Sequence, residues 1–284
     1  MPNVRLVLFS ALVNVKKWPV NPRIYTLIAL VIAFLAYHTA GLTEFAKEQG
    51  LSLTPWILPH LMNPPVLQVF ACLTILMFSD APFVDRHMPF IVVRSGRKNW
   101  IFGQLVYIFV ASFIYTLFIF LVSILVLVPQ VKFSMDWGVV YKSLAMDYSL
   151  APRATVFFSE ELMNIFSPIS ATLISLGLIW LGAVFIGVLI FCFNIVIGHM
   201  SGLIAAGFFI FMSIFSIVHG RIVLGEWIIY ISPISWMSIS FIDWNGTGDF
   251  LLPSVQYVLG FFIVTIIVMS VAAIKVFCKK DVQI

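Results

Sequence analysis

The side chains best suited to binding a partner are concentrated in one loop, residues 80–100, which reads DAPFVDRHMPFIVVRSGRKNW. The loop lies between two long uncharged runs of the chain and carries six formal charges: Asp80, Asp85, Arg86, Arg94, Arg97 and Lys98. Apolar residues such as Phe83 and Phe90 are interspersed with these charges. Exposed apolar groups are costly in a merely solvated loop and are typical of a docking surface. The loop is therefore predicted to bind a protein partner, and attraction to anionic lipid is the simpler alternative.

Motifs of catalysis are missing from the sequence. It contains no GxxxxGK[ST] phosphate loop, no HExxH and no GxSxG. The pair Glu160-Glu161 resembles the EExxxR start of some intramembrane proteases, but Ile165 stands where the arginine is needed. The three cysteines are odd in number and form no CxxC, so neither a disulfide framework nor a zinc site is indicated. We expect no enzyme activity in the chain itself and no metal or cofactor bound by it.

The elements that must position this loop are membrane-spanning helices. The chain is 62% hydrophobic and 10% charged, with a mean hydropathy of +1.08, whereas soluble domains have about 25% charged residues. Uncharged runs of about 20 residues are long enough to cross a bilayer. They predict an all-α integral membrane protein, one domain over residues 1–284, with six spans. These lie near residues 24–43, 58–79, 101–128, 170–197, 203–218 and 253–274.

Basic residues predict how these spans are oriented. Six spans place the two termini on one side of the membrane together with loop 80–100. That side carries eleven basic residues: Arg5, Lys16, Lys17, Arg23, Arg86, Arg94, Arg97, Lys98, Lys275, Lys279 and Lys280. The opposite side carries five: Lys47, Lys132, Lys142, Arg153 and Arg221. Because cytoplasmic loops are rich in lysine and arginine, the N- and C-termini are predicted to be cytoplasmic.

Three further segments accompany the spans. Residues 1–23 are predicted to hold a cytoplasmic interfacial helix, because Asn3, Ser10, Asn14 and Lys17 share one helical face. Residues 129–166 form an external segment too long for a tight turn. Residues 221–252 are rich in tryptophan and tyrosine, which favour the headgroup level, and are predicted to be an external re-entrant or interfacial segment.

Several of these features together resemble the membrane subunits of type-2 ATP-binding-cassette exporters. They are the six-span plan, the pattern FxxxRxGRxxW (Phe90, Arg94, Gly96, Arg97 and Trp100), the tight turn at residues 198–202, and YISPISW before the last span. The resemblance implies a coupling helix within residues 80–98 and a second contact at the turn that contains His199. It also implies two separate ATPase subunits that bind ATP and Mg, a second copy or a sister permease, and a bacterial plasma membrane.

The expected function is export of a hydrophobic or amphipathic substrate, such as an antimicrobial peptide, a lipid or a lipophilic drug. Contacts to the ATPase are assigned to eight residues: Asp80, Asp85, Arg86, Phe90, Arg94, Arg97, Lys98 and His199. Partners besides the ATPase are membrane lipid and the second permease, and no nucleic acid. A carrier or channel without an ATPase is one alternative, although ionisable groups are nearly absent from the spans. A membrane immunity protein that sequesters a toxic peptide through residues 129–166 is the other.

Overall fold

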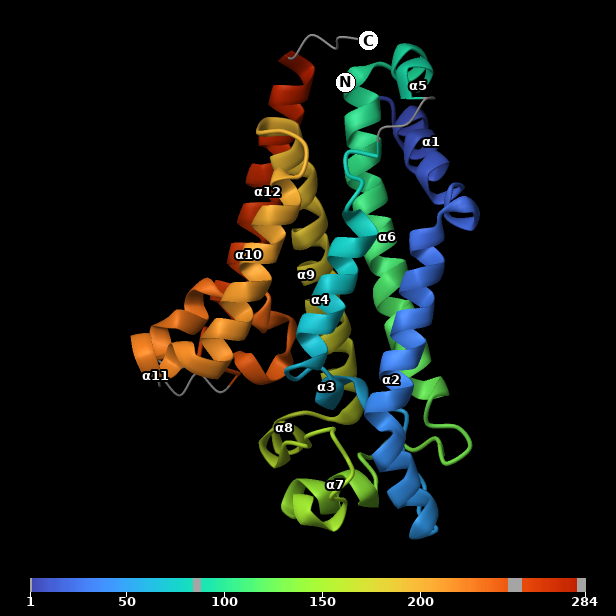
Figure 1. Cartoon of the computed structure of the whole chain (residues 1–284), viewed down its shortest axis with the longest axis vertical. Helices are drawn as coiled ribbons and strands as arrows, with labels where there is room; N and C mark the ends of the chain where they lie inside the picture. The colour runs from blue at the N-terminus through green and yellow to red at the C-terminus, as the bar shows by residue number, and fades with distance from the viewer. Residues whose placement is uncertain (1, 84–87, 245–251, 280–284) are drawn as a thin grey trace.

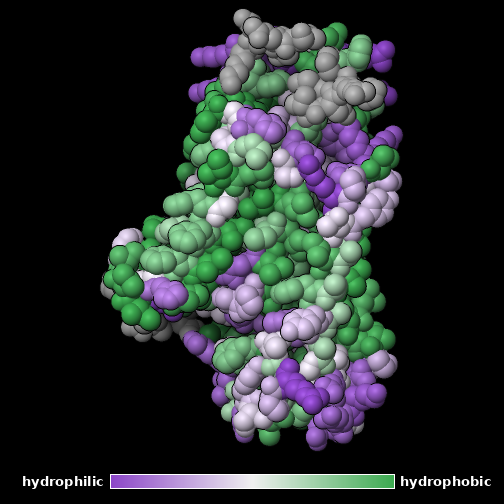
Figure 2. Space-filling view, viewed as in Figure 1, coloured by the Kyte–Doolittle hydropathy of each residue, from purple (hydrophilic) through white to green (hydrophobic). Residues whose placement is uncertain are grey.

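The computed structural model describes residues 2–83, 88–244 and 252–279, which form helices joined by turns. Five helical stretches are long and apolar enough to cross a membrane: α2 (Pro22–Glu48), α6 (Arg97–Leu125), α9 (Pro168–Val196), α10 (Ser201–Phe215) continued to Leu224, and α12 (Val255–Lys279). Hydrophobic residues cover the middle of the face shown in Figure 2, and hydrophilic residues gather towards its two ends. The prediction of an all-α, multi-pass membrane protein is confirmed.

The second of the six expected spans is shorter than predicted. Helix α4 (Val66–Phe78) has 13 residues and is therefore about 20 Å long, whereas a bilayer core measures about 30 Å. Pro64 and Pro65 stand directly before it. Proline lacks the amide donor that a helix interior needs, so the helix begins after this pair. The short helix α3 (Leu58–Leu61) lies upstream. Five long apolar helices, rather than six, are found in the described residues.

The helices form an elongated bundle with two distinct ends (Figure 1). The start of α1 (Val4–Val15), α5 (Met88–Ser95), the start of α6 and the end of α12 lie at one end, which we call the terminal end. The opposite end carries α7 (Val139–Met146) and α8 (Glu160–Ile165) and is called the cap end. Helix α9 is the most buried of the five long helices and packs against α4, α6, α10 and α12. It is the centre of the bundle.

The predicted N-terminal helix is present as α1, but its polar face does not point to water. Asn14 Nδ2 donates to Gln104 Oε1 of α6 at 2.6 Å, and the backbone N–H of Asn3 donates to Asn99 Oδ1 at 2.8 Å. Gly103 permits this close approach, since a Cβ there would lie 2.5 Å from the Cβ of Ser10. Apolar residues on the other side of α1 are exposed: Val4, Leu8, Phe9 and Leu12. The turn η1 (Trp18–Val20) then leads into α2.

At the cap end, residues 49–61 pack against residues 129–166, which include α7, η2 (Tyr148–Leu150) and α8. The hydroxyl of Tyr141 donates to the carbonyl of Thr54 at 2.6 Å, and Thr54 Oγ1 donates to the carbonyl of Trp137 at 3.0 Å. His60 of α3 is enclosed by aromatic rings, with the centroids of Trp137 and Phe158 each 5.0 Å away. Burial lowers the pKa of His60 to about 3. The cap is thus an ordered structure built around a neutral histidine.

The segment between α10 and α12 turns back against the bundle. It contains the π-helical turn η3 (Ser216–Gly220), α11 (Arg221–Leu224), η4 (Glu226–Ile231), η5 (Ser235–Met237) and η6 (Ile239–Phe241). Trp236 is fully buried and its Nε1 donates to the carbonyl of Ile229 at 2.8 Å. Ser235 shares hydrogen bonds with Ser213 of α10 and with Ser232. In Figure 1 these turns lie beside the bundle, between the terminal end and the level of α7.

Candidate functional site at the terminal end

The structure places the described predicted partner contacts on four parts of the chain. Phe90 and Arg94 lie on α5, and Arg97 and Lys98 begin α6. Asp80 follows α4, and His199 lies in the turn between α9 and α10. Asp85 and Arg86 lie outside the described residues. The loop after α4 and the α9–α10 turn, which the sequence analysis predicted as contact sites, therefore lie together at the terminal end.

Helix α5 is a short helix attached firmly to the bundle. Gly96, at φ +81°, separates it from α6 in a backbone conformation that favours glycine. Asn99 Nδ2 donates to the carbonyl of Ser95 at 2.6 Å across this break. Trp100, one turn into α6, is buried and stacks on Phe277 of α12 with ring centroids 4.9 Å apart. A force on α5 would therefore be passed to α6 and α12.

The outer face of α5 is apolar and uncovered. Phe90 is 71% exposed and Val93 is 76% exposed. Arg94 lies in the last turn of α5, and Arg97 and Lys98 follow at the start of α6. Leaving such side chains in water forgoes about 1.5 to 3 kcal/mol each relative to full burial. This combination of apolar and basic groups suits a docking surface.

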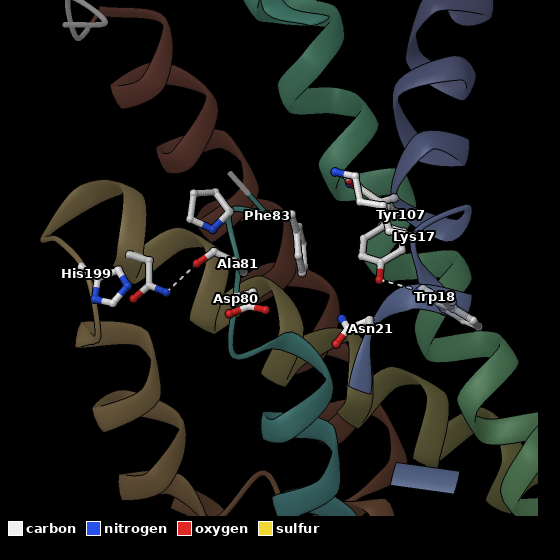
Figure 3. Close-up of a pocket in the computed structure, with 11 residues that line it drawn as sticks. Lys17, Trp18, Asn21, Asp80, Ala81, Phe83, Tyr107 and His199 are labelled. Carbon is white, nitrogen blue, oxygen red and sulfur yellow. Dashed lines mark hydrogen bonds between the residues drawn. The ribbon is translucent and has the colours of Figure 1, made fainter. Parts of the chain in front are cut away.

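A pocket of about 540 Å³ opens beside the loop that follows α4 (Figure 3). Asp80 and His199, which come from different turns, both line it. The remaining lining residues come from α1 and the turn η1 after it, the residue before α2, the loop after α4, α6 and α9: Asn14, Lys17, Trp18, Asn21, Ala81, Pro82, Phe83, Tyr107 and Asn194. The pocket therefore lies where parts of the chain that are far apart in sequence meet.

An ion pair and an aromatic contact hold the walls of this pocket. Arg23 of α2 pairs with Asp80 and donates through Nη1 to Ser79 Oγ at 2.9 Å. Both charged groups are partly exposed, so the pair contributes about 0 to 1 kcal/mol and serves mainly to position the loop. Trp18 Nε1 donates to the hydroxyl of Tyr107 at 2.9 Å. The ring of Phe83 lies edge-on to that of Tyr107, with centroids 4.9 Å apart.

Asn194 ties the two predicted contact turns to each other. Its Nδ2 donates to the carbonyl of Ala81 at 2.7 Å, the bond drawn at the left of Figure 3. Its Oδ1 accepts from the backbone N–H of Gly202 at 2.8 Å. Gly202 itself lies against α9, where a Cβ would be 2.4 Å from the carbonyl oxygen of Ile190. One amide thus links the α4–α5 loop with the start of α10.

Sequence reasoning missed Asn194 and Arg23. A signal for Asn194 existed, because it is the one amide side chain within residues 168–197, an otherwise apolar stretch. Polar side chains in such stretches are usually retained for a hydrogen-bonding reason. Asn14 and Lys17 were recognised as parts of a polar helical face, but their place in a pocket depends on α6 and on the loop after α4. The partner of Arg23 lies 57 positions away in sequence, and no local pattern indicates it.

The site can bind polar groups. No group of three or more His, Cys, Asp or Glu side chains that could hold a metal occurs in residues 2–83, 88–244 and 252–279. Asp80, His199 and the amides of Asn14 and Asn21 supply hydrogen-bonding groups along the wall. No protein-family model, no curated protein and no solved structure matches the chain.

Proposed function

We propose that this multi-pass helical protein is the membrane subunit of an ATP-driven exporter of the type-2 ATP-binding-cassette class, which docks separate ATPase subunits at its terminal end. The observation that carries the proposal is α5, a short helix at the end of the bundle with an uncovered apolar face and a basic terminus. Burial of Phe90 and Val93 against a partner would remove their apolar surface from water and so stabilise the complex. The sequence lacks a phosphate loop, so ATP and Mg are assigned to the partner subunits.

The route of the chain supports a sixth crossing of the membrane. Helix α2 runs towards the cap end, and α6 begins at the terminal end. The chain between them must therefore return along the bundle, and α4, which packs against α9 and α10, lies on this route. We assign α4, extended by its flanking turns, as the sixth crossing. This assignment gives loop 80–100 the same side of the membrane as α1.

The proposed mechanism uses the connections of α5. When the ATPase subunits close on ATP, their movement would displace α5 and, through Gly96 and Trp100, tilt α6. Asn194 would carry the same displacement to α10 through its two hydrogen bonds. A ligand shifts an equilibrium only by its different affinity for two states, so ATP must favour one position of α5. The spans carry few ionisable groups, and a hydrophobic or amphipathic substrate passing between two copies suits such a surface.

The experiment replaces one exposed valine on α5. Val93→Glu puts a charge on the docking face, and Val139→Glu is the matched control, a 66% exposed valine at the cap end. The chain is reconstituted in vesicles with a candidate ATP-binding-cassette ATPase subunit, and stimulation of ATP hydrolysis is measured. Val93→Glu should weaken the complex about tenfold or more, since one buried valine is equivalent to at least about 1.5 kcal/mol. Val139→Glu should leave it unchanged.

Three outcomes would overturn the proposal. Equal ATPase stimulation by both variants would show that α5 is not the docking helix. Substrate movement in vesicles without any ATPase, abolished by an uncoupler, would identify a secondary carrier or channel. Protection of cells from a toxic peptide by a complex whose ATPase is catalytically dead would identify an immunity protein.

A further inference from the structure

An apolar groove of about 660 Å³ runs between α1 and α5, separate from the pocket around Asp80. Its floor is formed by side chains of both helices, among them Leu8, Phe9, Leu12 and Phe90. Arg5 of α1 and Arg94 of α5 also line the groove and are exposed. Its volume falls within the range of about 300 to 1,000 Å³ that is usual for small-molecule sites.

The groove has a charged end and an apolar end. Figure 1 shows α5 beyond the first turn of α1, which then runs along α6 towards the middle of the bundle. Arg5 is therefore near α5, and Leu12, seven positions later, lies about 10 Å further towards the membrane interior. A ligand that fits must have a negatively charged group, which lies at the terminal end of the bundle, and an apolar chain, which lies along α1.

The two arginines have no acidic neighbour in this lining. Neither Arg5 nor Arg94 forms a salt bridge within the part of the chain that the structure describes, and the residues that line the groove include no aspartate or glutamate. Arginines from two different helices thus line an apolar groove that has no acidic residue among its described lining. Guanidinium groups bind phosphate in a forked, bidentate geometry.

We propose that this groove binds one anionic phospholipid from the leaflet at the terminal end, with its phosphate held by Arg5 and Arg94 and an acyl chain along Leu8, Phe9 and Leu12. The lipid would bridge α1 and α5 and so hold the short helix against the bundle. The site uses only this chain, and its existence does not depend on the docking of an ATPase.

The test titrates the detergent-solubilised full chain with dioleoyl phosphatidylglycerol or dioleoyl phosphatidylcholine and counts bound lipids by native mass spectrometry. One phosphatidylglycerol should be retained at concentrations at which phosphatidylcholine is not. Each basic residue near an anionic lipid surface contributes a factor of about five in affinity, so Arg5→Gln with Arg94→Gln should weaken retention about 25-fold. Lys16→Gln with Lys98→Gln removes the same charge from exposed positions outside the groove lining, and it should change retention less than twofold.

A second comparison separates a lipid from a free anion. Leu12→Ser should weaken phosphatidylglycerol retention with both arginines intact, and Leu125→Ser, an exposed leucine at the other end of α6, should not. Glycerol phosphate should not occupy the site at concentrations at which phosphatidylglycerol saturates it. Circular dichroism checks that each variant is folded. Equal retention of the two lipids, equal effects of the arginine and lysine pairs, or binding of glycerol phosphate as tight as that of the lipid would each overturn the proposal.

Discussion

Replacing Asn194 tests whether one amide holds the two turns of the terminal end together. Asn194→Leu keeps the approximate volume of the side chain and removes both hydrogen bonds, 2.7 Å to the carbonyl of Ala81 and 2.8 Å from the N–H of Gly202. Each such bond contributes about 1 kcal/mol, so we expect a loss of about 2 kcal/mol. For a chain of 284 residues, that loss lowers the midpoint of thermal unfolding by about 3 to 4 °C.

The measurement is tryptophan fluorescence during heating in one detergent at one scan rate, because unfolding of such proteins is commonly irreversible. Hydrogen exchange adds a local readout, and amide exchange should accelerate in residues 79–83 and 198–204 without a change in α7. Asn194→Asp keeps the oxygen that accepts from Gly202 and loses the donor to Ala81, so it should accelerate exchange mainly in residues 79–83. Asn164→Leu, at an exposed position of α8, is the control.

A midpoint within 1 °C of the unsubstituted chain for Asn194→Leu, together with unchanged exchange in both turns, would refute the reasoning. So would an equal fall in Asn164→Leu, because the effect would then be independent of the two hydrogen bonds.

Two further predictions concern the ends of the bundle. Gly103→Ala should destabilise the protein by about 1 to 3 kcal/mol through overpacking, because the new Cβ would meet Ser10 and the backbone of Val7. Gly177→Ala, which meets nothing within 4 Å, should not destabilise it, and equal unfolding midpoints would contradict the packing of α1 on α6. Burial lowers the pKa of His60 in the folded protein to about 3, whereas its pKa in the unfolded chain is about 6.5. Between these two pH values unfolding takes up a proton. The free energy of unfolding should therefore fall as the pH drops from about 6.5 towards 3, by up to about 1.4 kcal/mol per pH unit. His60→Phe should reduce this slope, measured as the unfolding midpoint against pH, and an unchanged slope would refute the assignment.

The long helices could be predicted from the sequence because their signal is local. Uninterrupted apolar runs located α2, α6, α9, α10 and α12, and the glycines around His199 located the turn between α9 and α10. The length of α4 was overestimated, since apolar character continues through Leu58–Leu61 while the backbone cannot continue one helix through Pro64 and Pro65.

The parts that could not be predicted depend on partners distant in sequence. The polar face of α1 was recognised, but only α6 determines that this face turns inward. Likewise, the charge on Asp80 was noted, while its pairing with Arg23 required the positions of α2 and α4. Periodicity indicates which residues share a face and leaves open which neighbour that face meets.

The inward polar face of α1 has a consequence for the timing of biosynthesis. Its hydrogen-bonding partners, Asn99 and Gln104, follow it by 96 and 90 positions. Chains are synthesised at about 5 to 20 residues per second, so α1 exists for about 5 to 20 seconds before its partners do. Throughout that interval its amides must be hydrated, which requires the nascent helix to wait at the membrane surface. Docking onto α6 is then a late event, completed only after α2 and α4 have been synthesised.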